Sequence, residues 1–130
     1  MPVGIMVRMN DTRFPRSHRL LRGEQFERVY HRRRSAADRL LVVHACENQL
    51  GHCRLGLSVS RRVGGAVVRN RWKRVIRAAF RLSHAELPAG LDLVVSPRRG
   101  VAVEPGLAAA QRSLVSLARQ AERRIERERR

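Results

Sequence analysis

The stretch RLGLSVSRRVGGAVVRNRWKRVIRAAFR, residues 54–81, decides the fold because it joins a strand, a break and a long helix. Its first part, residues 54–60, alternates leucine or valine with small or polar side chains. This period of two is typical of a half-buried strand. Gly64 and Gly65 then end the alternation, and the spacing of apolar residues changes to that of a helix.

From Ala66 to about Leu82, apolar residues recur every three or four positions and predict one buried helical stripe. This stripe comprises Val68, Trp72, Val75, Ile76, Ala79 and Phe80. The rest of the helix surface is strongly basic.

Further elements lie on both sides of this stretch. A short helix opens at Gly23, strands cover residues 39–46 and 91–96, and a final helix begins at Glu104-Pro105. The buried stripe of that final helix is predicted to be Leu107, Ala110, Leu114, Leu117, Ala118, Ala121 and Ile125. The strand at residues 54–60 is expected to pair antiparallel with the one before it, across the turn between them. The order is α-β-β-α-β-α, an α/β (α+β) two-layer sandwich with a small central sheet and room for a further strand in the turns.

Length and composition limit the class of protein. The chain has 130 residues, 43% of them hydrophobic and 30% charged, which suits one folded domain. No apolar run reaches the roughly 20 residues of a membrane span, and the N-terminus lacks the pattern of a signal peptide. The two cysteines, Cys46 and Cys53, make no disulfide framework, so we expect a cytoplasmic protein. The predicted divisions are a flexible basic arm at 1–17, a single domain at 18–126 and a basic tail at 127–130.

The charge points to a polyanionic partner. Lys and Arg number 28 against 11 acidic residues, a formal net charge of +17. No acidic residue lies between Glu47 and Glu86, whereas nine basic residues do. Lys73, Arg77 and Arg81 follow one another at helical spacing, so that like charges stack without relief.

RNA is the polyanion that the pattern favours. No helix-turn-helix or zinc-finger context accompanies the basic helix, so DNA is not expected. Phe26 and Tyr30 lie on one side of the first helix and could either stack on single-stranded bases or pack in the core. A ribosomal or assembly-type RNA-binding protein remains an alternative to a protein with a catalytic partner.

The sequence offers no catalytic or metal-ligating set. His44, Cys46, His52 and Cys53 match the spacing of no familiar zinc site. Nucleophile-elbow, zinc-protease and Walker A motifs are missing. We therefore predict no catalytic residue and no metal ligand in the chain.

The basic helix resembles a known signature. Arg69-Asn70-Arg71, followed by Lys73-Arg74 and Arg77, is similar to the RNR signature of the bacterial ribonuclease P protein subunit. RLGLSVSRRVGGAV (54–67), FERVY (26–30) and DLVVSPRRGVA (92–102) resemble other segments of that family, in the same order. The resemblance covers roughly residues 18–125.

The resemblance implies a fold and a partner. Members of this family have a small α/β sandwich, similar to a ribosomal-protein domain, with an uncommon left-handed β-α-β crossover. They are accessory subunits for a catalytic RNA, which removes the 5′ leader of precursor tRNA and requires Mg²⁺. The protein itself is expected to bind no cofactor.

The resemblance also implies two binding surfaces. The surface for the catalytic RNA comprises Arg69, Asn70, Arg71, Lys73, Arg74 and Arg77. The leader cleft comprises Phe26, Tyr30, His44, Ser58, Ser60 and Arg61. Here the chain departs from the family at two positions: family members often have an aromatic residue near His44, and Lys or Asn at the position of Gly65.

Overall fold

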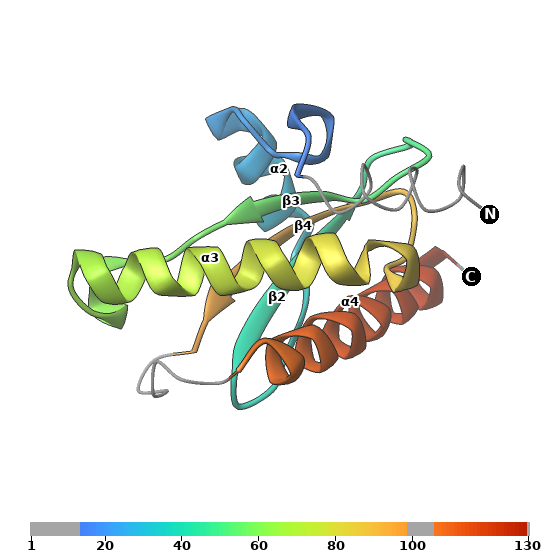
Figure 1. The fold of residues 1–130 in the computed structure, drawn as a ribbon. Helices are drawn as coiled ribbons and strands as arrows, with labels where there is room; N and C mark the ends of the chain where they lie inside the picture. The colour runs from blue at the N-terminus through green and yellow to red at the C-terminus, as the bar shows by residue number, and fades with distance from the viewer. Residues whose placement is uncertain (1–13, 99–105, 130) are drawn as a thin grey trace.

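The computed structural model describes residues 14–98 and 106–129, which form one four-stranded sheet and three α-helices (Figure 1). The strands are β1 (Arg34–Ala37), β2 (Leu41–Glu47), β3 (Arg54–Leu57) and β4 (Leu91–Pro97), in the sheet order β1-β2-β4-β3. The α-helices are α2 (Gly23–Arg32), α3 (Ala66–Ser83) and α4 (Leu107–Arg129). Three short 3-10 turns complete the elements: η1 (Arg16–His18), η2 (Arg61–Val63) and η3 (His84–Glu86).

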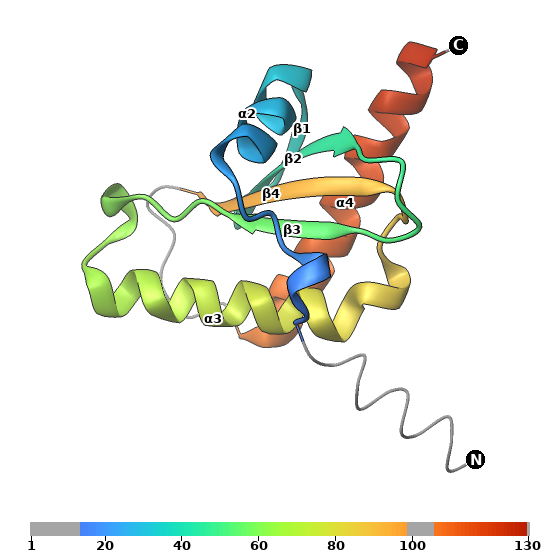
Figure 2. The ribbon, with the colours of Figure 1, turned by 90° about the horizontal axis from the view of Figure 1, so that it is seen from above.

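Helices cover both faces of the sheet. Helices α3 and α4 pack together on one face, and α2 covers part of the other (Figures 1 and 2). The main core lies on the α3–α4 side and includes Leu93, Val95 and Trp72. A smaller cluster beneath α2 contains Leu20, Val29, Cys46 and Val94, with Phe26 packed against it. Because α2 contributes only Val29 as a fully buried residue, it is the most thinly packed helix of the described residues.

The predicted pairing of residues 54–60 with the preceding strand is wrong. Strand β4 lies between β2 and β3, and it pairs antiparallel with β2 and parallel with β3. The apolar run of β4 is buried along nearly its whole length, and a central position is the one that buries both faces of a strand. Strand β3 also ends earlier than predicted, at Leu57, although the Ser58 N–H still donates to the Val95 carbonyl at 3.0 Å.

The further strand for which the pattern left room is β1. Its sequence gives no clear strand signal, because Arg33 and Arg34 have the character of a charged turn. Arg33 does turn the chain, with φ of 56°, and Arg34 then begins the antiparallel pairing with β2.

Helix α3 matches its prediction closely and makes the crossover of the fold. Trp72, Ile76, Ala79 and Phe80 are buried against the sheet and α4. The helix leads from β3 to the parallel strand β4, and the two views of the ribbon show this crossover to be left-handed (Figures 1 and 2). The resemblance to the family implies a left-handed crossover, whereas the general rule for β-α-β units predicts a right-handed one.

The end of α4 packs as part of the domain. The predicted start of the last helix at Glu104-Pro105 lies outside the described residues, and Leu107 is exposed rather than buried. The remaining predicted stripe of α4 is buried as expected. Residues 127–129 of the predicted tail are helical, and Glu128 bonds to Arg32 at 2.8 Å. Residues 1–13 of the predicted arm also lie outside the described part, and no helix within that part is long and apolar enough to cross a membrane.

Candidate nucleic-acid interface

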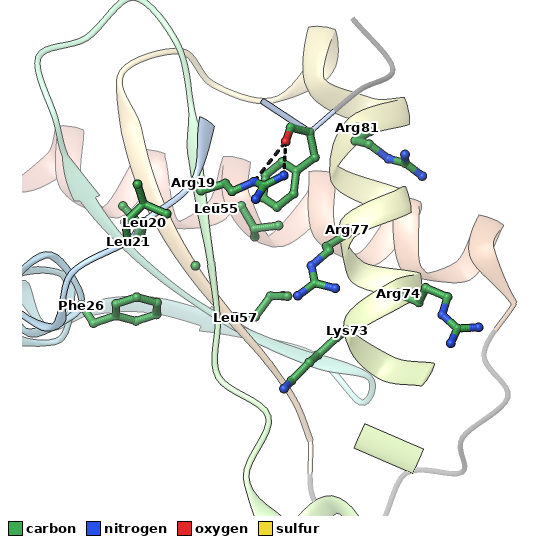
Figure 3. Close-up of a pocket in the computed structure, with 12 residues that line it drawn as sticks. Arg19, Leu20, Leu21, Phe26, Leu55, Leu57, Lys73, Arg74, Arg77 and Arg81 are labelled. Atoms are coloured by element: carbon green, nitrogen blue, oxygen red, sulfur yellow. Dashed lines mark hydrogen bonds between the residues drawn. The ribbon is translucent and has the colours of Figure 1, made fainter. Parts of the chain in front are cut away.

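A cleft of about 640 Å³ opens along the outer edge of β3, between α3 on one side and α2 with the segment before it on the other (Figure 3). Its apolar lining consists of Phe14, Leu20, Leu21, Phe26, Leu55, Gly56 and Leu57. Its basic lining consists of Arg19, Lys73, Arg74, Arg77 and Arg81. The cleft therefore places a ring and aliphatic side chains opposite a row of cations.

The Phe26 ring rests directly on the backbone of Gly56. A Cβ atom added at Gly56 would lie 2.7 Å from Cε2 of Phe26 and 2.9 Å from Cδ1 of Leu20. Side-chain carbons do not approach this closely, so the ring can take its place only because β3 has a glycine there. The glycine in the alternating pattern thus sets the depth of the cleft.

Gly56→Ala is expected to displace Phe26 and Leu20 and to lower the free energy of unfolding by about 1–3 kcal/mol. Gly51→Ala is the matched control, because nothing lies within 4 Å of a Cβ atom added at Gly51. Urea denaturation of both variants measures the difference. Equal stability of the two would show that the ring has room to shift.

The basic wall of the cleft comes from one side of α3. Lys73 and Arg77, one helical turn apart, point into the cleft, whereas Arg74 and Arg81 point away from it (Figure 3). Within residues 14–98 and 106–129, no carboxylate forms an ion pair with Lys73, Arg74 or Arg77. These cations are available to an anion from outside the protein.

The third part of the cleft comes from the segment before α2, which the sequence analysis treats as part of an arm as far as residue 17. The Leu20 N–H donates to the Leu55 carbonyl at 3.0 Å, so the segment continues the sheet beyond β3 for one bridge. The Arg19 guanidinium lies 4.8 Å from the centre of the Phe14 ring and donates two hydrogen bonds to the Phe14 carbonyl. Sequence reasoning missed these residues because only the fold brings them to β3.

The structure brings together only part of the predicted leader cleft. Phe26 lines the cleft, but Tyr30 and His44 contact each other outside its lining, with ring centres 5.0 Å apart. Burial lowers the pKa of His44, which keeps its ring neutral and suited to stacking. Ser58, Ser60 and Arg61 follow the end of β3 and do not line the cleft either.

The predicted RNA-binding residues are also divided. Lys73, Arg74 and Arg77 line the cleft, whereas Asn70 and Arg71 are exposed nearer the start of α3. Arg69 is half-buried, and its Nε donates to the Gly64 carbonyl at 3.2 Å. Arg69 therefore fastens the turn before α3 as well as adding charge. Arg81 also lines the cleft, although the predicted sites do not include it; its helical spacing from Arg77 is the signal that indicates it.

Paired carboxylates lie away from α3. Asp92 is fully buried and accepts hydrogen bonds from Arg54, Arg28 and Asn48 at 2.7–2.9 Å. Burial alone would raise the pKa of Asp92, but these bonds outweigh it and hold the pKa below its ordinary value. Glu47 similarly pairs with Arg32, whose hydrogen bond lowers the pKa of that carboxyl. The acidic residues thus neutralise arginines of α2 and the sheet.

No group of three His, Cys, Asp or Glu side chains in the described part of the chain could hold a metal ion. Cys46 and Cys53 are free and buried, and burial raises the pKa of both thiols. No Asp or Glu lines the cleft among the described residues. The chemistry that this arrangement supports is the binding of phosphates and bases.

Comparison with known proteins identifies relatives over most of the chain. The model of the family described as ribonuclease P matches residues 14–122. The ribonuclease P protein component of Brevibacillus brevis is 46% identical over 87 residues, which cover 66% of this chain and 69% of that protein. The solved RNase P protein of Staphylococcus aureus is 34% identical with a TM-score of 0.67, covering 78% of this chain and 93% of that one. The protein of Thermotoga maritima is 29% identical with a TM-score of 0.68, covering 75% and 92% of the two chains.

Proposed function

Since the chain belongs to the ribonuclease P protein family, and is the accessory protein of an RNA-containing enzyme that matures tRNA 5′ ends, we propose how its surfaces divide that work. The start and outer face of α3 bind the catalytic RNA. The cleft along β3 binds the 5′ leader of precursor tRNA. The free thiols of Cys46 and Cys53 suit a protein that works in the cytoplasm.

The surface proposed for the catalytic RNA is the one predicted from the signature: Arg69, Asn70, Arg71, Lys73, Arg74 and Arg77. Guanidinium groups bind phosphates through paired hydrogen bonds, and each neutralised phosphate releases condensed counterions. Of these residues, Lys73 and Arg77 point into the cleft, so we assign these two to the boundary between the catalytic RNA and the leader.

One observation carries the leader proposal: Phe26 faces Lys73 and Arg77 across the open edge of β3. A single strand needs aromatic rings for its bases and cations for its phosphates, and this cleft offers both at once. Tyr30 and His44 extend the aromatic surface beneath α2, and Ser58, Ser60 and Arg61 extend the polar surface beyond β3. A leader longer than the cleft would reach these residues.

The chemical step belongs to the RNA in this proposal. We propose that RNA phosphates hold the Mg²⁺ ions of the holoenzyme, an assignment that fits a cleft whose described lining contains cations and no carboxylate. The protein contributes fixed cations, which reduce the repulsion between two RNA molecules and hold the leader in place. Its contribution is therefore largest when Mg²⁺ is scarce.

Single-turnover cleavage of precursor tRNA by a bacterial ribonuclease P RNA, with and without this protein, tests the proposal. At low Mg²⁺ we expect a large increase in rate with the protein, and a much smaller increase at high Mg²⁺. Cutting the leader back to a stub should remove the part of the increase that depends on the cleft. An increase that depends on neither Mg²⁺ nor leader length would contradict the electrostatic account.

Phe26→Ala is expected to weaken the preference for precursor over mature tRNA by roughly tenfold, because stacking of one base on an aromatic ring contributes about 1–3 kcal/mol. Competition between the two tRNAs for the holoenzyme measures this preference. Phe26→Leu is the matched variant, since it keeps the apolar contact with Gly56 but has no ring to stack. If Phe26→Leu keeps the full preference, the ring serves packing alone.

A further inference from the structure

A second basic groove lies on the α4 side of α3, separate from the cleft along β3. It runs between the end of α3 with η3 and residues 108–123 of α4, and has a volume of about 550 Å³. Among the described residues, three arginines line it, Arg112, Arg119 and Arg123, and one carboxylate, that of Glu86. Neither the family signature nor the predicted sites include any of these residues.

The three arginines form one row on α4. Their spacing of seven and four residues puts them on the same side of the helix, about 6–10 Å apart along its axis. That side is opposite the buried stripe of Ala121 and Leu114, and all three arginines are exposed. Within the described part of the chain, none of them forms an ion pair.

Polar contacts between the walls hold the groove in shape. The Gln111 side-chain amide donates to the Ser83 hydroxyl at 3.1 Å, and Ser83 is buried at the end of α3. Arg119 donates to the Glu86 carbonyl at 3.2 Å, which ties α4 to η3. Along the row, Arg112 and Arg123 therefore lie on either side of Arg119, which is already hydrogen-bonded to η3. These two are the arginines of the row for which the structure gives no hydrogen bond within the described residues.

Glu122 and Glu126 are further carboxylates of the same helix close in sequence to Arg119 and Arg123. Burial and the neighbouring Glu126 raise the pKa of Glu122, while Arg119 and Arg123 act in the opposite direction. Glu122 does not line the groove, so it reduces the positive charge without blocking access. With Glu86 included, the lining still has an excess of two positive charges.

We propose that this groove binds the phosphate backbone of the catalytic RNA, as a second contact beyond the signature surface of α3. Arg74 and Arg81 point away from the cleft, on the outer side of α3 (Figure 3). Because α4 packs beside α3, an RNA segment bound on that outer side would extend onto the groove that contains the arginine row. A phosphate backbone fits this lining because the groove offers guanidinium groups without an aromatic ring for stacking bases.

The test compares two variants with the same change of net charge. Arg112→Gln/Arg123→Gln removes the two arginines of the groove that have no hydrogen bond among the described residues, and Arg33→Gln/Arg127→Gln removes two exposed arginines that do not line the groove. Binding of each to ribonuclease P RNA alone is measured over a range of salt concentrations. The groove variant should bind roughly tenfold more weakly at about 0.15 M salt, with the slope of log affinity against log salt reduced by about two.

Three results would overturn the proposal. Equal weakening by both pairs would show a general effect of net charge, and unchanged affinity of the groove variant would show that the groove is not used. Weaker binding of precursor tRNA to the holoenzyme, with unchanged binding of the catalytic RNA, would assign the groove to the substrate. Leader dependence is measured separately with Phe26 variants, so failure here leaves the proposed leader cleft standing.

Discussion

Replacing Lys73 and Arg77 together by glutamate is expected to weaken binding of leader-containing precursor tRNA by roughly a hundredfold, the largest functional effect of any change in the cleft. Two cations that point into the cleft become two anions, so repulsion of the leader phosphates is added to the loss of attraction. Affinity for the catalytic RNA should fall as well, because both residues belong to the proposed boundary. Titration of the assembled enzyme with fluorescent precursor tRNA measures the first effect.

The control reverses the same number of charges away from the cleft. Arg33 and Arg127 are exposed and do not line it, so Arg33→Glu/Arg127→Glu should cost far less affinity. Substrates with leaders of decreasing length separate the two surfaces. If the Lys73/Arg77 variant loses the same affinity for a stub as for a full leader, these residues contact only the catalytic RNA, and the boundary assignment is wrong.

Helix α3 was predictable because one element contains all of its signals. Trp72 and Ile76 repeat at helical spacing, and Gly64 and Gly65 mark the start of the helix. Basic residues without an acidic neighbour indicate its charged side. Such signals depend on neighbours in the chain. The family comparison then confirms the function that the signature on this helix implied.

The cleft was not predictable in the same way because it depends on sheet order. Because β4 lies between β2 and β3, β3 is an edge strand, and the segment containing Leu20 pairs with its outer edge. That edge places Gly56 beneath Phe26, about 30 residues away in the chain, and opposite α3. His44 shares β2 with the main core but faces α2, which is why it contacts Tyr30 and does not line the cleft along β3.

Helix α2, which forms the wall of the cleft opposite α3, is held in position by an ion pair with the buried Asp92. Helix α2 buries little apolar surface, but its Arg28 donates to Asp92, near the start of the inner strand β4, at 2.7 Å. Arg54 of β3 donates a hydrogen bond to each oxygen of the same carboxylate. Asp92 thus links β4, β3 and α2, the three elements that set the distance between Phe26 and the edge of β3.

Asp92→Ala is expected to lower the free energy of unfolding by about 3–5 kcal/mol, the largest stability effect of any single change considered. The loss exceeds that of an ordinary ion pair because the half-buried Arg54 guanidinium keeps its charge without a partner. Glu24→Gln, which removes the exposed ion pair with Arg22, is the control and should cost about 0–1 kcal/mol. Urea denaturation near neutral pH compares the two.

The dependence on pH provides a second test of the same carboxylate. The pKa of Asp92 in the folded protein lies below its ordinary value, so ionised Asp92 stabilises the fold fully above the unfolded pKa of about 3.9. That stabilisation is lost as the pH falls through the folded pKa, whereas an alanine at this position has nothing to titrate. The difference in stability between the protein and Asp92→Ala should therefore be constant from neutral pH to about pH 5 and shrink below about pH 4. If the difference in free energy of unfolding stays constant into strong acid, the variant is destabilised by lost packing and not by the lost carboxylate charge. Asp92 would then not hold α2 through Arg28.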